Sequence, residues 1–144
     1  MGLIDTHTHL ESFVAATRNN QANELVSEAG PLSTELPVIL LGDLNSDPAD
    51  SAPASNAYNK IVGDEYAEDG GFADLGVEVD TCCFSETLFD PPPAVFTSRI
   101  DHVLGRGEVS EVSSALIGDD PALRTDTGLW PTDHGGVVAT LKVG

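Results

Sequence analysis

Apolar and polar positions alternate along this chain in patterns that predict several strands and few helices. Residues 37–42 form a continuous apolar run between a proline and a glycine, which is typical of a strand covered on both faces. From residue 137 to residue 143 every second position is apolar, which predicts a half-buried final strand. Residues 17–29 have apolar side chains at helical spacing and end at a Gly-Pro pair, so they predict a helix.

The remaining segments predict an α/β layered domain without an internal linker. Residues 57–62 predict one or two helical turns. Further strands are predicted at residues 3–8, 81–84, 100–104 and 109–117, surface loops at residues 47–55 and 90–93, and a turn at residues 69–71.

Composition narrows the classes of protein that fit. The 144 residues are enough for one domain, and 24 acidic against 6 basic side chains give a net charge of −18. This charge argues against non-specific binding to nucleic acid, because phosphate-binding surfaces are basic. No apolar run reaches the roughly 18 residues needed to cross a bilayer, so no membrane span is predicted.

The two cysteines, Cys82 and Cys83, are adjacent in the sequence. Neighbouring cysteines rarely bridge each other, and no Cys/His spacing of a zinc site is present. The sequence therefore predicts two small side chains, buried or half-buried.

Four segments, residues 5–10, 42–47, 99–102 and 132–135, concentrate titratable side chains at the expected ends of strands. Carboxylates, an amide and imidazoles that converge from strand ends are the groups that a divalent-metal hydrolytic site needs. Each segment alone also has a structural explanation. The second can be a turn held by its Asx side chains, the third can pair Asp101 with Arg99, and the others can be a loop cap and surface histidines.

Around these segments stand the motifs GDLNSDP (residues 42–48), SRIDHVL (98–104) and TDHGGVVATL (132–141), with supporting features in THLE (8–11), Arg18 with Gln21, TCC (81–83) and TGLWP (127–131). Together these motifs resemble the endonuclease/exonuclease/phosphatase superfamily. The resemblance covers residues 1–144 and implies an α/β fold: half, or a truncated form, of a four-layer α/β sandwich. In that sandwich two packed mixed or antiparallel β-sheets are flanked by helices.

The resemblance implies a hydrolase of phosphate esters, acting on phosphodiesters or phosphomonoesters with Mg²⁺ or Mn²⁺ by in-line attack of water. Asp43 would orient or deprotonate the water, and Asn45 would hydrogen-bond the phosphoryl oxygens. His134 would lie against the scissile phosphate, with Asp101 fixing its ring.

Two further roles follow from the resemblance. Asp133 would help to hold the metal, and His9 would be a second imidazole facing the phosphate. Either Asp43 or His134 can be the general base. The substrate can be a nucleic acid, a lipid or a small molecule.

The same resemblance implies that only the second, C-terminal half of the domain is represented. The first half supplies an asparagine and a glutamate that is the main metal ligand, and Glu11 follows His9, on the wrong side of it to be that glutamate. The chain is then a fragment, starts at a mis-chosen methionine, or has lost the metal site. We expect a fragment with weak or no activity alone, which would self-associate through an exposed sheet edge or face.

Two other interpretations stay open. A catalytically inactive member of the family could act as a binding module. Alternatively, His7 and His9 resemble the metal-binding HxH pair of the amidohydrolases and TatD-like deoxyribonucleases, although a barrel of that kind needs far more chain.

Overall fold

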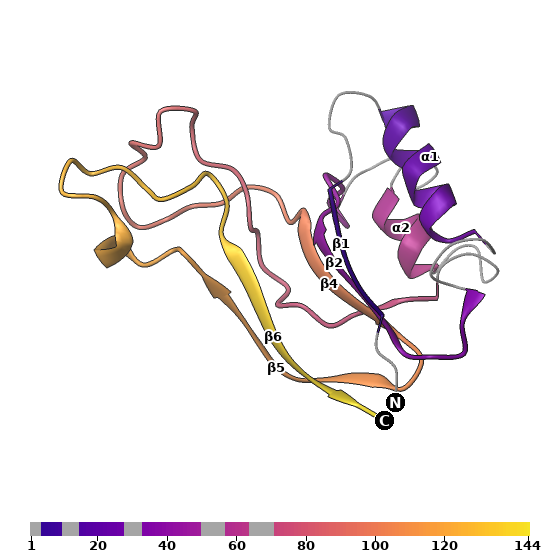
Figure 1. Cartoon of the computed structure of the whole chain (residues 1–144). Coiled ribbons are helices and arrows are strands. Elements are labelled where there is room, and N and C mark those ends of the chain that lie inside the picture. The colour runs from indigo at the N-terminus through magenta and orange to yellow at the C-terminus, as the bar shows by residue number, and fades with distance from the viewer. Residues whose placement is uncertain (1–3, 10–14, 28–32, 50–56, 64–70) are drawn as a thin grey trace.

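The computed structural model describes residues 4–9, 15–27, 33–49, 57–63 and 71–144 (Figure 1). In chain order the elements are β1 (Ile4–His9), α1 (Ala15–Leu25), β2 (Val38–Asp43), α2 (Ala57–Val62), β3 (Ala73–Asp74), β4 (Asp101–Arg106), β5 (Val109–Ile117), a 3₁₀ turn (Pro121–Leu123) and β6 (Gly136–Val143). Strands β1, β2, β4 and β3 form one sheet in that order, and β5 pairs with β6 in a second sheet. The first sheet is mixed, because only β1 and β2 are parallel.

Strand β2 is covered on both of its faces, as its continuous apolar run predicts. Val38 and Leu40 belong to the core beneath the two helices. Ile39 and Leu41 line an apolar cavity of about 270 Å³, together with residues of β6. Figure 1 shows α1 and α2 on one side of the first sheet and the β5–β6 hairpin on the other. The predicted architecture of two packed sheets flanked by helices is confirmed.

Burial against the first sheet, rather than length, holds the helices in place. The core beneath them consists of Ala22, Val38, Leu40, Leu44, Ala57, Ile61, Phe72 and Leu104.

Within the part of the chain that the structure describes, neither helix combines the length and apolarity needed to cross a membrane.

A lobe of loops, residues 81–98 and 118–135, extends beyond the sheets at the left of Figure 1. It has its own aromatic core, in which the ring of Phe84 lies 4.6 Å from that of Phe96 and 4.8 Å from that of Trp130. All three side chains are buried. The lobe is therefore a packed unit despite its lack of regular strands.

The predicted strand at residues 81–84 is wrong, because only Cys82 makes β-bridges there, one to Ser98 and one to His134. The physical reason is that the backbone hydrogen bonds converge instead of advancing along the chain: the N–H groups of Thr81 and Cys82 both donate to the carbonyl of Ser98, and the carbonyl of Cys82 accepts from both Thr97 and Ser98. The Thr81 hydroxyl meanwhile accepts from the first backbone N–H groups of β4 and its lead-in.

The two predicted helices and one predicted loop are present in the described residues. The helix predicted at residues 17–29 is α1, which ends at Leu25, and residues 28 and 29 lie outside the described residues. The two turns at residues 57–62 are α2, and residues 90–93 form an exposed loop. Most of the predicted turn at residues 69–71 and the loop from residue 50 to residue 55 also lie outside the described residues.

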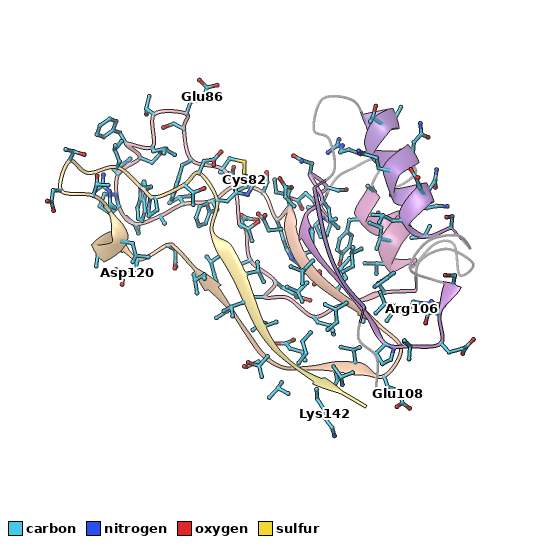
Figure 2. All side chains as sticks on the ribbon, viewed as in Figure 1. Cys82, Glu86, Arg106, Glu108, Asp120 and Lys142 are labelled. Atoms are coloured by element: carbon cyan, nitrogen blue, oxygen red, sulfur yellow. A yellow bond between two sulfur atoms is a disulfide. The ribbon has the colours of Figure 1, made fainter. Side chains whose placement is uncertain are left out.

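The cysteines differ from the prediction. Cys82 and Cys83 are joined by a disulfide. Cys82 is buried, whereas Cys83 is exposed. The pair lies where the lobe meets the first sheet (Figure 2).

We predict that Leu104→Ala, at the fully buried centre of β4, lowers the free energy of unfolding by about 2–5 kcal/mol, because it removes packed methyl groups and leaves a cavity. Val112→Ala on exposed β5 is the control and should change it by less than about 0.5 kcal/mol. Urea unfolding followed by circular dichroism measures both. Equal effects of the two substitutions would contradict this assignment of the core.

Candidate active site

Three neighbouring strands bring candidate residues to one end of the first sheet. The backbone register pairs His9 of β1 with Asp43 of β2, and Asp43 with Asp101 of β4. Directly paired positions in a sheet share one face, and so the three residues form a row across the end of the sheet. The sequence segments that predicted a site therefore do meet in the fold.

The loop after β2 is held in a tight turn by its own side chains. The backbone N–H of Asn45 donates to Asp43 Oδ1 at 2.7 Å, and Asn45 Nδ2 lies 3.3 Å from Asp43 Oδ2. Asn45 has a φ of 47°, in the left-handed region that asparagine tolerates better than most residues. The structural explanation of this segment is thus correct, and it also fixes the Asp43 carboxylate beside the Asn45 amide.

The lead-in to β4 secures the same loop from the other side. The backbone N–H of Leu44 donates to the carbonyl of Ile100 at 2.8 Å, and the N–H of Arg99 donates to Asp47 Oδ2 at 2.9 Å. The ends of β2 and β4 are therefore locked together, with Asp43 and Asp101 in fixed relative positions.

Asp101 receives two hydrogen bonds on one carboxylate oxygen. His134 Nδ1 donates to Asp101 Oδ2 at 2.8 Å, and the hydroxyl of Thr81 donates to the same oxygen at 2.7 Å. With Nδ1 engaged, the ring presents Nε2 on its other side. Sequence reasoning assigned no role to Thr81, and the only signal of it was the TCC motif.

The backbone around His134 is held by the lobe. The N–H of Gly135 donates to the carbonyl of Thr81 at 2.7 Å. A Cβ at Gly135 would lie 2.7 Å from Leu116 and 2.9 Å from Phe96, closer than real side chains approach. Glycine at this position therefore lets the chain pass against the aromatic core, which sets the place of the imidazole.

Acidic neighbours raise the pKa of His134. Burial alone lowers the pKa of the ring, but the hydrogen bond to Asp101 and the charges of Asp101, Asp133 and Asp43 outweigh it. The net result is a pKa above the ordinary 6.5. The site thus favours the imidazolium form, which suits a group that faces a phosphate.

Arg99 does not pair with Asp101, so that alternative is wrong. Its guanidinium pairs instead with Asp74, which also lies 3.4 Å from His102 Nδ1. Burial raises the pKa of the Asp74 carboxyl, but hydrogen bonds and the positive neighbours lower it overall. Asp74, Arg99 and His102 form a structural group that supports the loop after β2. His102 Nε2 contacts the carbonyl of Ser46 in that loop at 3.1 Å.

Some of the predicted site residues lie close together in the structure, and others do not. Potential ligand atoms of Asp43, Asp101 and His134 lie within 4.8 Å of one another. Asp133 is exposed, and among the described residues it is not part of such a group. His9 is placed by its backbone in β1 only, at the register position beside Asp43.

The comparisons with known proteins identify the family. A sequence model described as the Endonuclease/Exonuclease/phosphatase family matches residues 4–134. The chain therefore belongs to this family, whose members hydrolyse phosphate esters with divalent metals. No curated protein matches the sequence.

Solved structures share the fold at low sequence identity. An endonuclease/exonuclease/phosphatase family protein from Bacteroides thetaiotaomicron has a TM-score of 0.62 at 22% identity, with 95% of this chain and 48% of that chain covered. A mannosyl-6-phosphatase from the same organism gives 0.61 at 20%, covering 96% and 50%. D. rerio TDP2 in complex with a single-strand DNA product gives 0.66 at 21%, covering 96% and 56%. The chain thus spans about half the length of the solved structures it matches.

We predict that Asp101→Asn lowers the pKa of His134, because it removes the charged acceptor at Nδ1. The raised native pKa means that this pair stabilises the fold fully below about pH 6.5, the usual pKa of an unfolded histidine, and that the contribution is lost as pH rises through the native pKa. NMR titration of the His134 ring measures the pKa. Asp133→Asn, which removes a charge without that hydrogen bond, should lower it less, and an unchanged pKa in Asp101→Asn would contradict the assignment.

Proposed function

We propose that this chain contributes the catalytic centre of a metal-dependent phosphoesterase that hydrolyses phosphodiesters or phosphomonoesters by in-line attack of water. The observation that carries the proposal is the hydrogen-bonded Asp101–His134 pair, with Asp43 beside it at the end of aligned strands. A positioned imidazole and a positioned carboxylate are the two groups that such a displacement requires.

The positions of the atoms support the following roles. Asp43, fixed by the turn, orients or deprotonates the attacking water, and Asn45 beside it hydrogen-bonds a phosphoryl oxygen. His134 Nε2, which lies 3.3 Å from Cys82 Sγ in the structure, would contact the scissile phosphate, while Asp101 and Thr81 hold the ring in orientation. Asp101 thus positions the ring in addition to the part in cation binding proposed below, whereas His134 touches the substrate.

The donor set suits a hard cation. Carboxylate oxygens of Asp43 and Asp101 lie close together, and Mg²⁺ and Mn²⁺ prefer oxygen ligands. We propose that these two side chains hold the ion, with Asp133 contributing from the edge. When bound, the ion would neutralise charge on the phosphoryl oxygens. His9, in register with Asp43, would add a second imidazole on the substrate side.

Hydrolysis of bis-p-nitrophenyl phosphate, with p-nitrophenyl phosphate as the monoester, tests this function. We expect slow turnover that requires Mg²⁺ or Mn²⁺ and stops with a chelator. His134→Ala should reduce the rate roughly 10²- to 10⁴-fold, the usual contribution of a positioned proton-transfer group. Glu86→Gln, at the tip of the lobe in Figure 2, is the matched control and should leave the rate unchanged.

Metal-independent turnover, or equal rates for the parent and an Asp43→Ala, His134→Ala double variant, would contradict the proposal. Mn²⁺ binding without any turnover would favour the alternative function, a binding module built on an inactive site. Electron paramagnetic resonance of free Mn²⁺ separates these outcomes.

Self-association stays a prediction. Ala115, Ile117 and Val138 are exposed apolar side chains of the β5–β6 hairpin, and Ala115 pairs directly with Val138. The net charge of −18 opposes contact between copies, so salt should promote it. We expect dimers in sedimentation velocity at high salt, and Val138→Lys should abolish them. Monomers of the parent chain at every salt concentration would contradict the prediction.

A further inference from the structure

The cysteines lie against the catalytic histidine, and the proposed reaction makes no use of them. Cys82 Sγ is 3.3 Å from His134 Nε2, the ring nitrogen opposite the one that Asp101 engages. Cys83 adds a second sulfur, and the ligand atoms of Cys82, Cys83 and His134 all lie within 4.8 Å of one another. Two sulfurs and an imidazole nitrogen are ligands that soft and borderline cations prefer.

We propose that, in the reduced protein, Cys82, Cys83 and His134 form a binding site for a thiophilic divalent cation of the Zn²⁺ class. This site is distinct from the carboxylate site proposed for Mg²⁺, since it uses the opposite nitrogen of the ring and sulfur in place of oxygen.

The spacing between Cys82 and His134 fits such an ion. Zn²⁺ with a thiolate at about 2.3 Å and an imidazole at about 2.0–2.1 Å in tetrahedral geometry separates sulfur from nitrogen by about 3.6 Å. The observed 3.3 Å between Cys82 Sγ and His134 Nε2 is within a few tenths of an ångström of this value. Three protein ligands leave one position for water, as in open zinc sites.

Two of the three ligands are held before any ion arrives. The backbone of Cys82 is tied to Ser98 in both directions: its N–H donates at 2.9 Å and its carbonyl accepts at 2.7 Å. Asp101 fixes the His134 ring through Nδ1, which is the carboxylate–histidine arrangement that orients metal-binding imidazoles. Cys83 is exposed and gives the ion a route to the site.

Binding requires that the disulfide be opened first. A phosphine reductant supplies two electrons to the sulfur–sulfur bond and becomes the phosphine oxide, with its oxygen and the two thiol protons coming from water. The two thiols then give their protons to the buffer as the cation binds. An oxidised pair has no thiolate to offer, so the thiol state controls occupancy of the site.

Occupancy would also affect catalysis, a consequence that rests on the proposed function. The ion would take Nε2, the atom that faces the phosphate, and so would inhibit hydrolysis even with Mg²⁺ present. Binding of the ion itself does not depend on the chain being a hydrolase.

Cadmium titration of the whole 144-residue chain tests the site, because thiolate-to-cadmium charge transfer gives an ultraviolet band that is independent of activity. The reduced protein, freed of phosphine under nitrogen, should bind one equivalent of Cd²⁺, and Zn²⁺ should displace it. Excess Mg²⁺ should not displace it, which excludes diffuse binding to the acidic surface. The oxidised protein should show no band.

Variants locate the ligands. Cys83→Ser, at an exposed position, should lose most of the band, and His134→Gln should weaken affinity at least tenfold. Asp101→Asn, which removes only the orienting partner, should weaken it roughly 10- to 100-fold. Glu86→Gln on the same lobe should bind like the parent, and circular dichroism shows that each variant is folded.

Equal Cd²⁺ affinity in the parent and in His134→Gln would overturn the proposal, because the thiols would then bind without the imidazole. A full band in Cys83→Ser would do the same. Failure of the hydrolysis assay would leave these binding results intact, so failure of the site and failure of the proposed function are distinguishable.

Discussion

The hydrogen bond between Asp101 and His134 is the interaction on which the site depends. The two residues are 33 positions apart in sequence, and one carboxylate oxygen of Asp101 also receives the hydroxyl of Thr81. This oxygen therefore ties the four-stranded sheet to the loop lobe. It fixes which ring nitrogen faces outward, and its charge helps to raise the pKa of the imidazole. A carboxylate that accepts two hydrogen bonds is costly to remove, since both donors would lose their partner together.

The packing of the chain keeps that bond short. On the sheet side, β4 is buried between the helices and the hairpin, and its lead-in is clamped to the loop of Asp43. On the lobe side, the aromatic core sits against the segment of His134, where Gly135 allows close approach. Among the described residues, neither side has a long helix to provide rigidity. Order comes instead from loops whose backbone groups are hydrogen-bonded across the chain, such as Cys82 between Ser98 and His134.

The sequence predicted the strands that follow a simple period and missed structure that side chains impose. The apolar run of β2 and the alternation of β6 predicted both strands, because burial on two faces or on one face determines those patterns. The segment at Thr81 looked like a strand, but its backbone hydrogen bonds converge on Ser98 and do not continue as a ladder. Motifs predicted that Asp43, Asp101 and His134 would meet, yet they did not predict the contact of Cys82 with His134. That contact depends on a fold-level approach between residues 52 positions apart.

Charge gives the imidazole its particular importance in this chain. The chain has six basic and 24 acidic residues. Of the basic residues, Arg18 donates to the carbonyl of Asn45 and Arg99 pairs with Asp74. A phosphate that approaches Asp43 and Asp101 meets negative charge, so it needs compensating positive charge nearby. His134 provides part of it, because the carboxylates around it raise its pKa. In the proposed site the acidic residues would serve two purposes: they would hold a cation, and they raise the pKa of the imidazole. A cation bound to His134 Nε2 together with the cysteine sulfurs would take the place of the proton that makes the imidazole positive. His134 therefore links the two proposed sites.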